Sequence, residues 1–133
     1  MAAWGTKTFD NDDTMDWMGE FLEARSLGFL NETLSSVAEE QEVYIEEPYG
    51  SSALAAAEVV AALRGNPNGP LPEELAEALV NFKPKKVSDT VAALAGKALT
   101  RLLDNSELKE LWEESEDYEA WTSNVQQLLK KLV

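Results

Sequence analysis

The segment ALAAAEVVAAL at residues 53–63 constrains the fold of this chain more than any other feature. Alanine favours helices, and Glu58 is the only ionisable side chain in the segment, so the expected helix is apolar on every side. A helix without a polar face has to be covered by other elements. Its small alanine side chains also let neighbouring helices approach closely. The sequence therefore predicts that residues 53–63 form the most buried helix, with Glu58 inside it.

Apolar residues recur at intervals of three and four along most of the remaining chain, which is the period of a helix. The apolar stripes are Trp17, Met18, Phe21 and Leu22; Leu27, Leu30, Leu34 and Val37; Leu75, Leu79 and Phe82; Val87, Val91, Leu94, Ala98 and Leu102; Leu108, Leu111 and Trp112; and Trp121, Val125, Leu128, Leu129 and Leu132. Residues 43–45 alone are expected to be extended, and no pattern indicates paired strands. The sequence predicts one all-α domain over residues 1–133, a bundle of six or seven helices.

Polar residues that can cap helices precede several of these stripes. The candidate caps are Asp10, Asn11 or Asp12 for the first helix, Ser51 or Ser52 for the central helix, and Ser88 for the fifth helix. Pro72 suits the first turn of a helix. The strongest signal is Asp104 with Glu107 three residues later, a capping box that predicts a helix start at residue 104.

The chain is strongly acidic, with 25 Asp and Glu against 11 Lys and Arg and a net charge of −14. Residues 1–50 hold twelve acids against Lys7 and Arg25, so ten of the fourteen net negative charges lie there. Such a field repels nucleic acid phosphates and anionic lipid, and it attracts basic proteins. We therefore expect no nucleic acid partner, no membrane partner and a basic protein partner.

The chain contains neither histidine nor cysteine. This composition excludes disulfides, most zinc sites and most pairs of nucleophile and base, and we expect no cofactor and no catalytic residue. A chain without cysteine fits a reducing compartment. No apolar run reaches the length of a membrane span, and the N-terminus lacks the pattern of a signal peptide, so we expect a soluble cytoplasmic protein.

An aspartate cluster near the N-terminus invites comparison with a calcium-binding loop; its members are Asp10, Asp12, Asp13 and Asp16. An EF-hand loop that starts at Asp10 requires glycine at its sixth position and an acid at its twelfth, where Met15 and Phe21 stand. The alternative is helix capping, with acids placed at the positive end of the helix dipole. The sequence therefore predicts no metal site here.

Glu58 is the most informative single residue. A desolvated carboxylate either has a raised pKa and takes part in acid–base chemistry, or is held ionised by a partner. Because no histidine is available as a second group, we interpret Glu58 as a structural buried acid. Its expected partners are Lys97, Arg101 or the backbone amides of the turn at residues 4–6.

Four blocks of sequence resemble a small bacterial protein family catalogued as domain of unknown function 4259. They are the N-terminal WGTKTFDNDD with Asp16 and Trp17, SALAAAEVVAALRG at residues 52–65, LPEEL at residues 71–75 and DNSELKELWEE at residues 104–114. The resemblance covers nearly the whole chain but not the KPKK segment at residues 83–86. It implies no activity, cofactor or site residue.

Charge favours a non-enzymatic binding protein, of the inhibitor or immunity type, that neutralises a basic toxin or nuclease. The expected contact residues are carboxylates and tyrosines of the acidic N-terminal segment: Asp12, Asp13, Asp16, Glu20, Glu39, Glu40, Tyr44, Glu46, Glu47 and Tyr49. Two alternatives remain open. One is a small enzyme that uses carboxylates alone or with Mg²⁺; the other is a housekeeping module whose acidity serves only solubility.

Overall fold

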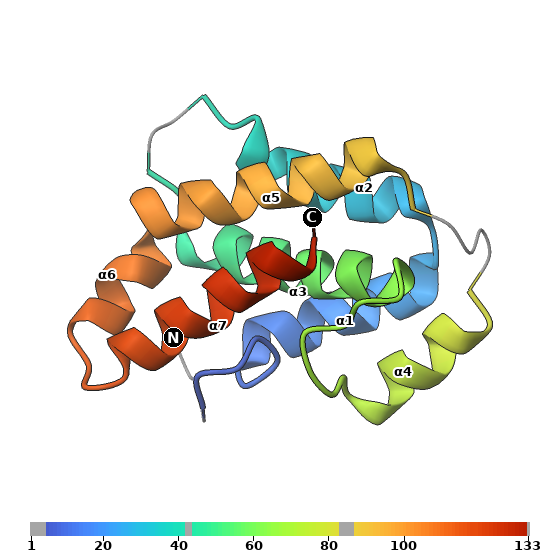
Figure 1. The fold of residues 1–133 in the computed structure, drawn as a ribbon, viewed down its shortest axis with the longest axis horizontal. Coiled ribbons are helices and arrows are strands. Elements are labelled where there is room, and N and C mark those ends of the chain that lie inside the picture. The colour runs from blue at the N-terminus through green and yellow to red at the C-terminus, as the bar shows by residue number, and fades with distance from the viewer. Residues whose placement is uncertain (1–4, 42–43, 83–86, 133) are drawn as a thin grey trace.

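In the computed structural model, which describes residues 5–41, 44–82 and 87–132, the chain forms seven α-helices (Figure 1). The helices are α1 (Asp12–Ala24), α2 (Leu27–Ala38), α3 (Glu47–Leu63), α4 (Glu73–Val80), α5 (Asp89–Asp104), α6 (Glu107–Glu113) and α7 (Tyr118–Lys131). The described residues contain no β-strand. The all-α bundle expected from the helical period is therefore confirmed. No helix among the described residues is both long and apolar enough to cross a membrane.

Helix α3 is the centre of the bundle, and α1, α2, α5, α6 and α7 all pack against it (Figure 1). Every residue from Ala53 to Ala61 is buried, as the apolar composition of the segment predicts. Glu58 is among them, with 6% of its surface exposed. The alanines of α3 permit five neighbouring helices to contact one helix, since small side chains allow close approach.

Four aromatic rings join α1, α2 and the residues after α4. The Trp17 ring stacks on Phe21 with centroids 5.4 Å apart, and Phe21 in turn stacks on Phe82 at 5.8 Å. Phe29 packs against both α1 rings, and the Trp17 indole Nε1 donates a hydrogen bond to Thr33 Oγ1 at 3.0 Å. Trp17 therefore belongs to the core, as its place on an apolar stripe indicates.

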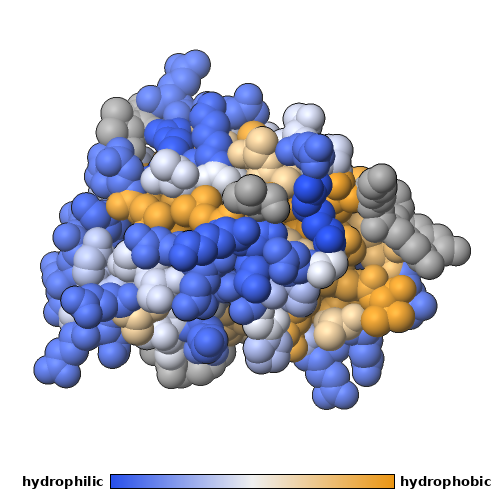
Figure 2. All heavy atoms as spheres, in the orientation of Figure 1, coloured by the Kyte–Doolittle hydropathy of each residue, from blue (hydrophilic) through white to orange (hydrophobic). Residues whose placement is uncertain are grey.

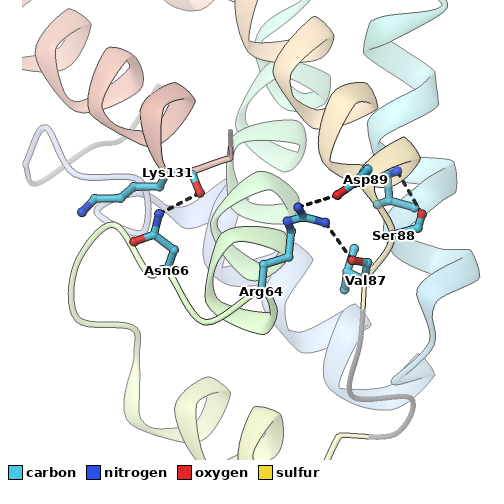
Figure 3. Close-up of polar contacts among 7 residues, drawn as sticks. Arg64, Asn66, Val87, Ser88, Asp89 and Lys131 are labelled. Atoms are coloured by element: carbon cyan, nitrogen blue, oxygen red, sulfur yellow. Dashed lines mark hydrogen bonds and ion pairs between the residues drawn. The ribbon is translucent and has the colours of Figure 1, made fainter.

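The end of α3 is tied to both α5 and α7 (Figure 3). Arg64 donates through Nη1 to the Val87 carbonyl oxygen and through Nη2 to Asp89 Oδ1, both at 2.8 Å. Asn66 Nδ2 donates to the Lys131 carbonyl oxygen at 3.1 Å. These contacts fix the point at which the chain leaves the central helix.

Two of the expected helix caps are present. Asn11 precedes α1, and its Oδ1 accepts a hydrogen bond from the Thr14 amide at 2.9 Å. Ser88 precedes α5, and its Oγ accepts from the Val91 amide at 3.3 Å. Both caps act within three residues, which is why a local pattern identifies them.

The expected start of the central helix at Ser51 or Ser52 is wrong, because α3 begins at Glu47. Pro48 is accommodated there because the first turn of a helix has no internal acceptor for its amide hydrogens. The Glu47 amide instead donates to Glu107 Oε1 at 2.8 Å. The cap comes from α6, far along the chain, so no local pattern could indicate it.

The capping box at Asp104 is also wrong. Helix α5 continues through Asp104, and Ser106 caps α6 by accepting from the Lys109 amide at 3.1 Å. The Glu107 carboxylate accepts from the Glu47 amide of α3, and the Glu107 amide donates to the Ile45 carbonyl oxygen at 2.8 Å. Ile45 forms an isolated parallel bridge with Ser106, so one residue of the expected 43–45 segment is extended, while Val43 lies outside the described residues.

Candidate functional site

The ten expected contact residues fall into two groups. The first group lies on α1 and consists of Asp12, Asp13, Asp16 and Glu20. The second lies at the end of α2 and the start of α3 and consists of Glu39, Glu40, Tyr44, Glu46, Glu47 and Tyr49. The starts of α1 and α3 and the end of α2 lie at the same end of the bundle, on the left in Figure 1. Figure 2 shows hydrophilic residues over much of the face viewed there.

Two tyrosines of the second group are exposed, which is unusual for large rings. Tyr44 is 43% exposed and Tyr49 is 57% exposed. Together with neighbouring residues they line a shallow hollow of about 80 Å³, whose lining is Ser36, Glu40, Tyr44, Ile45, Glu46 and Tyr49. The structure therefore brings both rings and two of the expected carboxylates, Glu40 and Glu46, to one place.

Helix α6 adds acids to this surface that sequence reasoning missed. Partial desolvation, the hydrogen bond and charge of Glu110, and the charges of Glu107 and Glu46 together raise the pKa of Tyr44 to about 12. The phenol therefore stays neutral and lies among carboxylates. We call Glu40, Tyr44, Glu46, Tyr49 and Glu110 the acidic tyrosine patch. Glu110 is remote in sequence, and tertiary contacts such as the Ile45–Ser106 bridge and the Glu47–Glu107 hydrogen bond place α6 there.

Glu47 does not belong to the accessible surface, so its assignment as a contact residue is wrong. Its side chain is only 8% exposed and accepts a hydrogen bond from Ser51 Oγ at 3.0 Å. Burial and the hydrogen bond and charge of the Asp13 carboxyl together raise the pKa of Glu47 to about 7, against the opposing hydrogen bond from Ser51. Two carboxyl groups hydrogen-bond only when one carries a proton. Glu47 and Asp13 therefore join the starts of α1 and α3.

Glu58 is buried and hydrogen-bonded, but its expected partners are wrong. The Thr8 hydroxyl donates to Glu58 Oε2 at 2.5 Å. Burial raises the pKa of Glu58, while Thr8, Asn68 and the charge of Lys7 oppose that rise. Arg101 lies elsewhere, since its Nη1 donates to the Val37 carbonyl oxygen at 2.8 Å and to that of Glu40, which caps the end of α2.

Among the described residues, the remaining expected partners do not bind Glu58 either. Lys97 is an exposed residue of α5, and Trp4 lies outside the described residues. In the part of the chain that the structure describes, the segment that contacts Glu58 is the one that follows the expected turn, and it does so through the Thr8 side chain.

Two asparagines extend the Glu58 contact into a network. Asn124 Nδ2, from α7, donates to Thr8 Oγ1 at 3.2 Å, and Asn68 Nδ2 donates to Asn124 Oδ1 at 3.2 Å. The N-terminal segment, α3, the α3–α4 connection and α7 therefore meet at one point. Sequence reasoning missed Thr8, Asn68 and Asn124, because none of them lies on a periodic stripe or in a recognisable motif.

The four aspartates of the N-terminal cluster do not converge on one point and have different surroundings. Asp10 Oδ2 accepts from the Lys7 amide at 3.2 Å, and Asp13 faces Glu47, while Asp12 and Asp16 are exposed. Within the described part of the chain, no group of three or more acidic, histidine or cysteine side chains is arranged to hold a metal ion. The geometry is that of a helix start.

Comparison with known proteins places the chain by family alone. No curated protein and no solved structure matches it significantly. A family model with the description "Domain of unknown function (DUF4259)" matches residues 2–124, which is nearly the whole chain. The protein therefore belongs to the DUF4259 family.

Proposed function

We propose that this protein is a non-enzymatic acidic binding protein and that the acidic tyrosine patch is its contact surface for a basic protein. The observation that carries the proposal is the exposure of Tyr44 and Tyr49 among the carboxylates of Glu40, Glu46 and Glu110. Exposed aromatic rings are the side chains that most often dominate binding energy at protein interfaces.

The chemistry of the patch suits arginine and lysine side chains. A guanidinium stacks on a tyrosine face while its N–H groups donate to neighbouring carboxylates. In each such contact the positive charge is stabilised both by the face of the tyrosine ring and by a neighbouring carboxylate. The patch therefore favours a partner that presents several basic side chains, such as the phosphate-binding cleft of a nuclease or toxin.

The remaining exposed acids of the first group supply long-range attraction. Asp12, Asp16 and Glu20 recur every four residues, so they share one exposed face of α1. With a net charge of −14 the protein attracts a basic partner before contact, which accelerates association at low salt. The proposed role is that of an inhibitor or immunity-type protein, and the cysteine-free composition fits a cytoplasmic one.

The test compares two charge reversals of equal size. In Glu46→Lys/Glu110→Lys the reversed acids belong to the patch, whereas Glu73→Lys/Glu77→Lys reverses two exposed acids of α4, at the opposite end of the bundle in Figure 1. The parent protein and both variants are used as baits for basic proteins, beginning with the product of the neighbouring reading frame. The captured protein is purified, and its affinity is measured by calorimetry over a range of salt concentrations.

We expect the patch reversal to weaken binding by about a hundredfold and Tyr49→Ala by about thirtyfold, which is typical of interface hot spots. The α4 reversal should change mainly the association rate, since it alters only the long-range field. An acidic partner, an affinity that does not respond to salt, or equal losses in the two reversals would contradict the proposal.

A further inference from the structure

The Glu58 network lies in a cleft that is separate from the acidic tyrosine patch. The cleft has a volume of about 400 Å³, within the usual range of small-molecule sites. Its lining comes from four places in the chain: residues 7–10, residues 68–72, Glu58 of α3 and Asn124 of α7. No residue of the patch lines it.

The polar part of the cleft is rich in hydrogen-bond acceptors. Glu58 contributes a carboxylate that is held by Thr8 and makes no ion pair with a described residue. Asn68 uses its Nδ2 for Asn124, and its Oδ1 is buried without a donor from the residues that the structure describes. Buried acceptors without donors are costly, so this lining is suited to a ligand that supplies N–H groups.

The remaining walls are apolar. Phe9 and Leu71 are half-buried members of the core periphery, and Pro70 and Pro72 stand beside them. Lys7 is the single basic residue in the lining, and it is exposed, so Glu58 and Asp10 leave the cleft with a net negative charge. A few fixed polar groups within an apolar lining is the usual composition of a small-molecule site.

We propose that this cleft binds a small organic ammonium ion, with its N–H groups directed to Glu58 and Asn68 and its apolar part against Phe9 and Leu71. The charge of the cleft excludes an anionic ligand of similar size, because Glu58 and Asp10 would repel it. The buried carboxylate gives selectivity, because a neutral ligand would leave its charge without compensation. This site is independent of the proposed function, since its lining and the patch share no residue.

The test is a titration of ¹⁵N-labelled protein with phenethylammonium chloride, followed by two-dimensional NMR. We expect saturable shifts of the backbone amides of Thr8, Gly69 and Leu71 at millimolar concentrations, an affinity range accessible to fragments of about nine non-hydrogen atoms. The neutral analogue 2-phenylethanol and the anion phenylacetate should bind at least about tenfold more weakly, since each lacks the charge-assisted donor.

Two variants distinguish the cleft from unspecific attraction of a cation to an acidic protein. Glu58→Gln preserves an acceptor for Thr8 but removes the charge, and we expect about a tenfold loss of affinity for phenethylammonium. The matched control Glu113→Gln removes one charge from an exposed residue of α6 and should leave the affinity unchanged. Gly69→Val leaves Glu58 unchanged. Gly69 lines the cleft, and a Cβ there meets no atom within 4 Å, so valine should keep the fold; we expect its added bulk beside the cleft to reduce binding.

Saturable shifts confined to the cleft and reduced in both variants support the proposal. It is overturned if phenethylammonium causes no saturable shifts, if the shifts lie on the acidic tyrosine patch, if 2-phenylethanol binds equally well, or if either Glu58→Gln or Gly69→Val binds as the parent does.

Discussion

The Glu107 carboxylate accepts a hydrogen bond from the Glu47 amide at 2.8 Å, so the central helix is capped by a residue sixty positions later in the chain. The same residue donates its amide to Ile45, and the two hydrogen bonds fix α6 to the start of α3. A helix start normally draws its cap from the residue just before it. Here the buried start of α3 depends on the docking of another helix.

Glu107→Ala should therefore destabilise the protein by about 1 kcal/mol, the usual value of a helix cap, because the Glu47 amide loses its acceptor. Unfolding in urea measures the change. Glu110→Ala, in the same helix, is the control and should have a smaller effect on the free energy of unfolding, since its side chain is exposed. Equal decreases in the free energy of unfolding in the two variants would show that the hydrogen bond from Glu47 to Glu107 does not stabilise the protein.

Glu47→Gln should stabilise the protein at neutral pH. The folded pKa of Glu47 is about 7 against an ordinary value of 4.5, so between these values the folded protein binds a proton that the unfolded chain has lost. Stability therefore falls as pH rises from 4.5 to 7, and above that the penalty is complete, at most roughly 3 kcal/mol. Glutamine carries no such penalty. Melting temperatures of parent and variant, measured from pH 4.5 to pH 8, test this.

The two proteins should have similar stability at pH 4.5 and diverge as pH rises. Asp16→Asn, an exposed change of equal charge on α1, should leave the pH profile of the parent unaltered in shape. Because burial also raises the pKa of Glu58, the Glu47→Gln variant should keep a smaller slope of the same sign. A variant profile parallel to that of the parent would exclude Glu47 as the titrating group.

Glu58→Ala should cost on the order of 1–3 kcal/mol, because the Thr8 hydroxyl, to which Asn124 donates in turn, loses its acceptor in a buried site. Glu58→Gln should cost less, since its side-chain oxygen can still accept from Thr8. Thermal unfolding of the two variants gives the comparison. If the alanine variant melts with the parent, the network does not contribute to stability.

Two glycines in helices should respond to alanine in opposite directions. A Cβ at Gly50 would lie 3.0 Å from Leu108 Cδ1 and 3.1 Å from Leu102 Cδ2, so Gly50→Ala should destabilise by about 1–3 kcal/mol through overpacking. A Cβ at Gly19 meets no atom within 4 Å, and Gly19→Ala should stabilise α1 by about 0.5–1 kcal/mol. Urea unfolding of both variants measures the changes. A destabilised Gly19→Ala variant would contradict the open exposure of this face of α1.

What the sequence predicts well is local. The spacing of Trp17 and Phe21 indicates their burial, and Asn11 and Ser88 cap helices that begin within three residues of them. The composition of residues 53–63 is enough to place Glu58 inside the protein. Each of these properties depends on a helical repeat or on one turn of backbone.

What the sequence does not predict depends on which helices meet. Ser51 is a plausible cap from the sequence, but the start of α3 is capped by Glu107 of α6. Asp104 is also a plausible cap, but it is the last residue of α5. Thr8 reaches Glu58, and Glu110 reaches Tyr44, only through tertiary packing. No periodicity encodes these pairings, so the acidic patch and the cleft could be located only from the structure.

The hydrogen bond from Asn124 to Thr8 closes a loop of 116 residues, and this has a consequence for the order of folding. Closing so long a loop costs more chain entropy than pairing neighbouring helices such as α1 and α2. On the ribosome, the contact also waits until α7 has been synthesised. The segment before α1 that carries Thr8 should therefore dock last in folding and open first in hydrogen exchange, so the cleft around Glu58 should be the last part of the molecule to form.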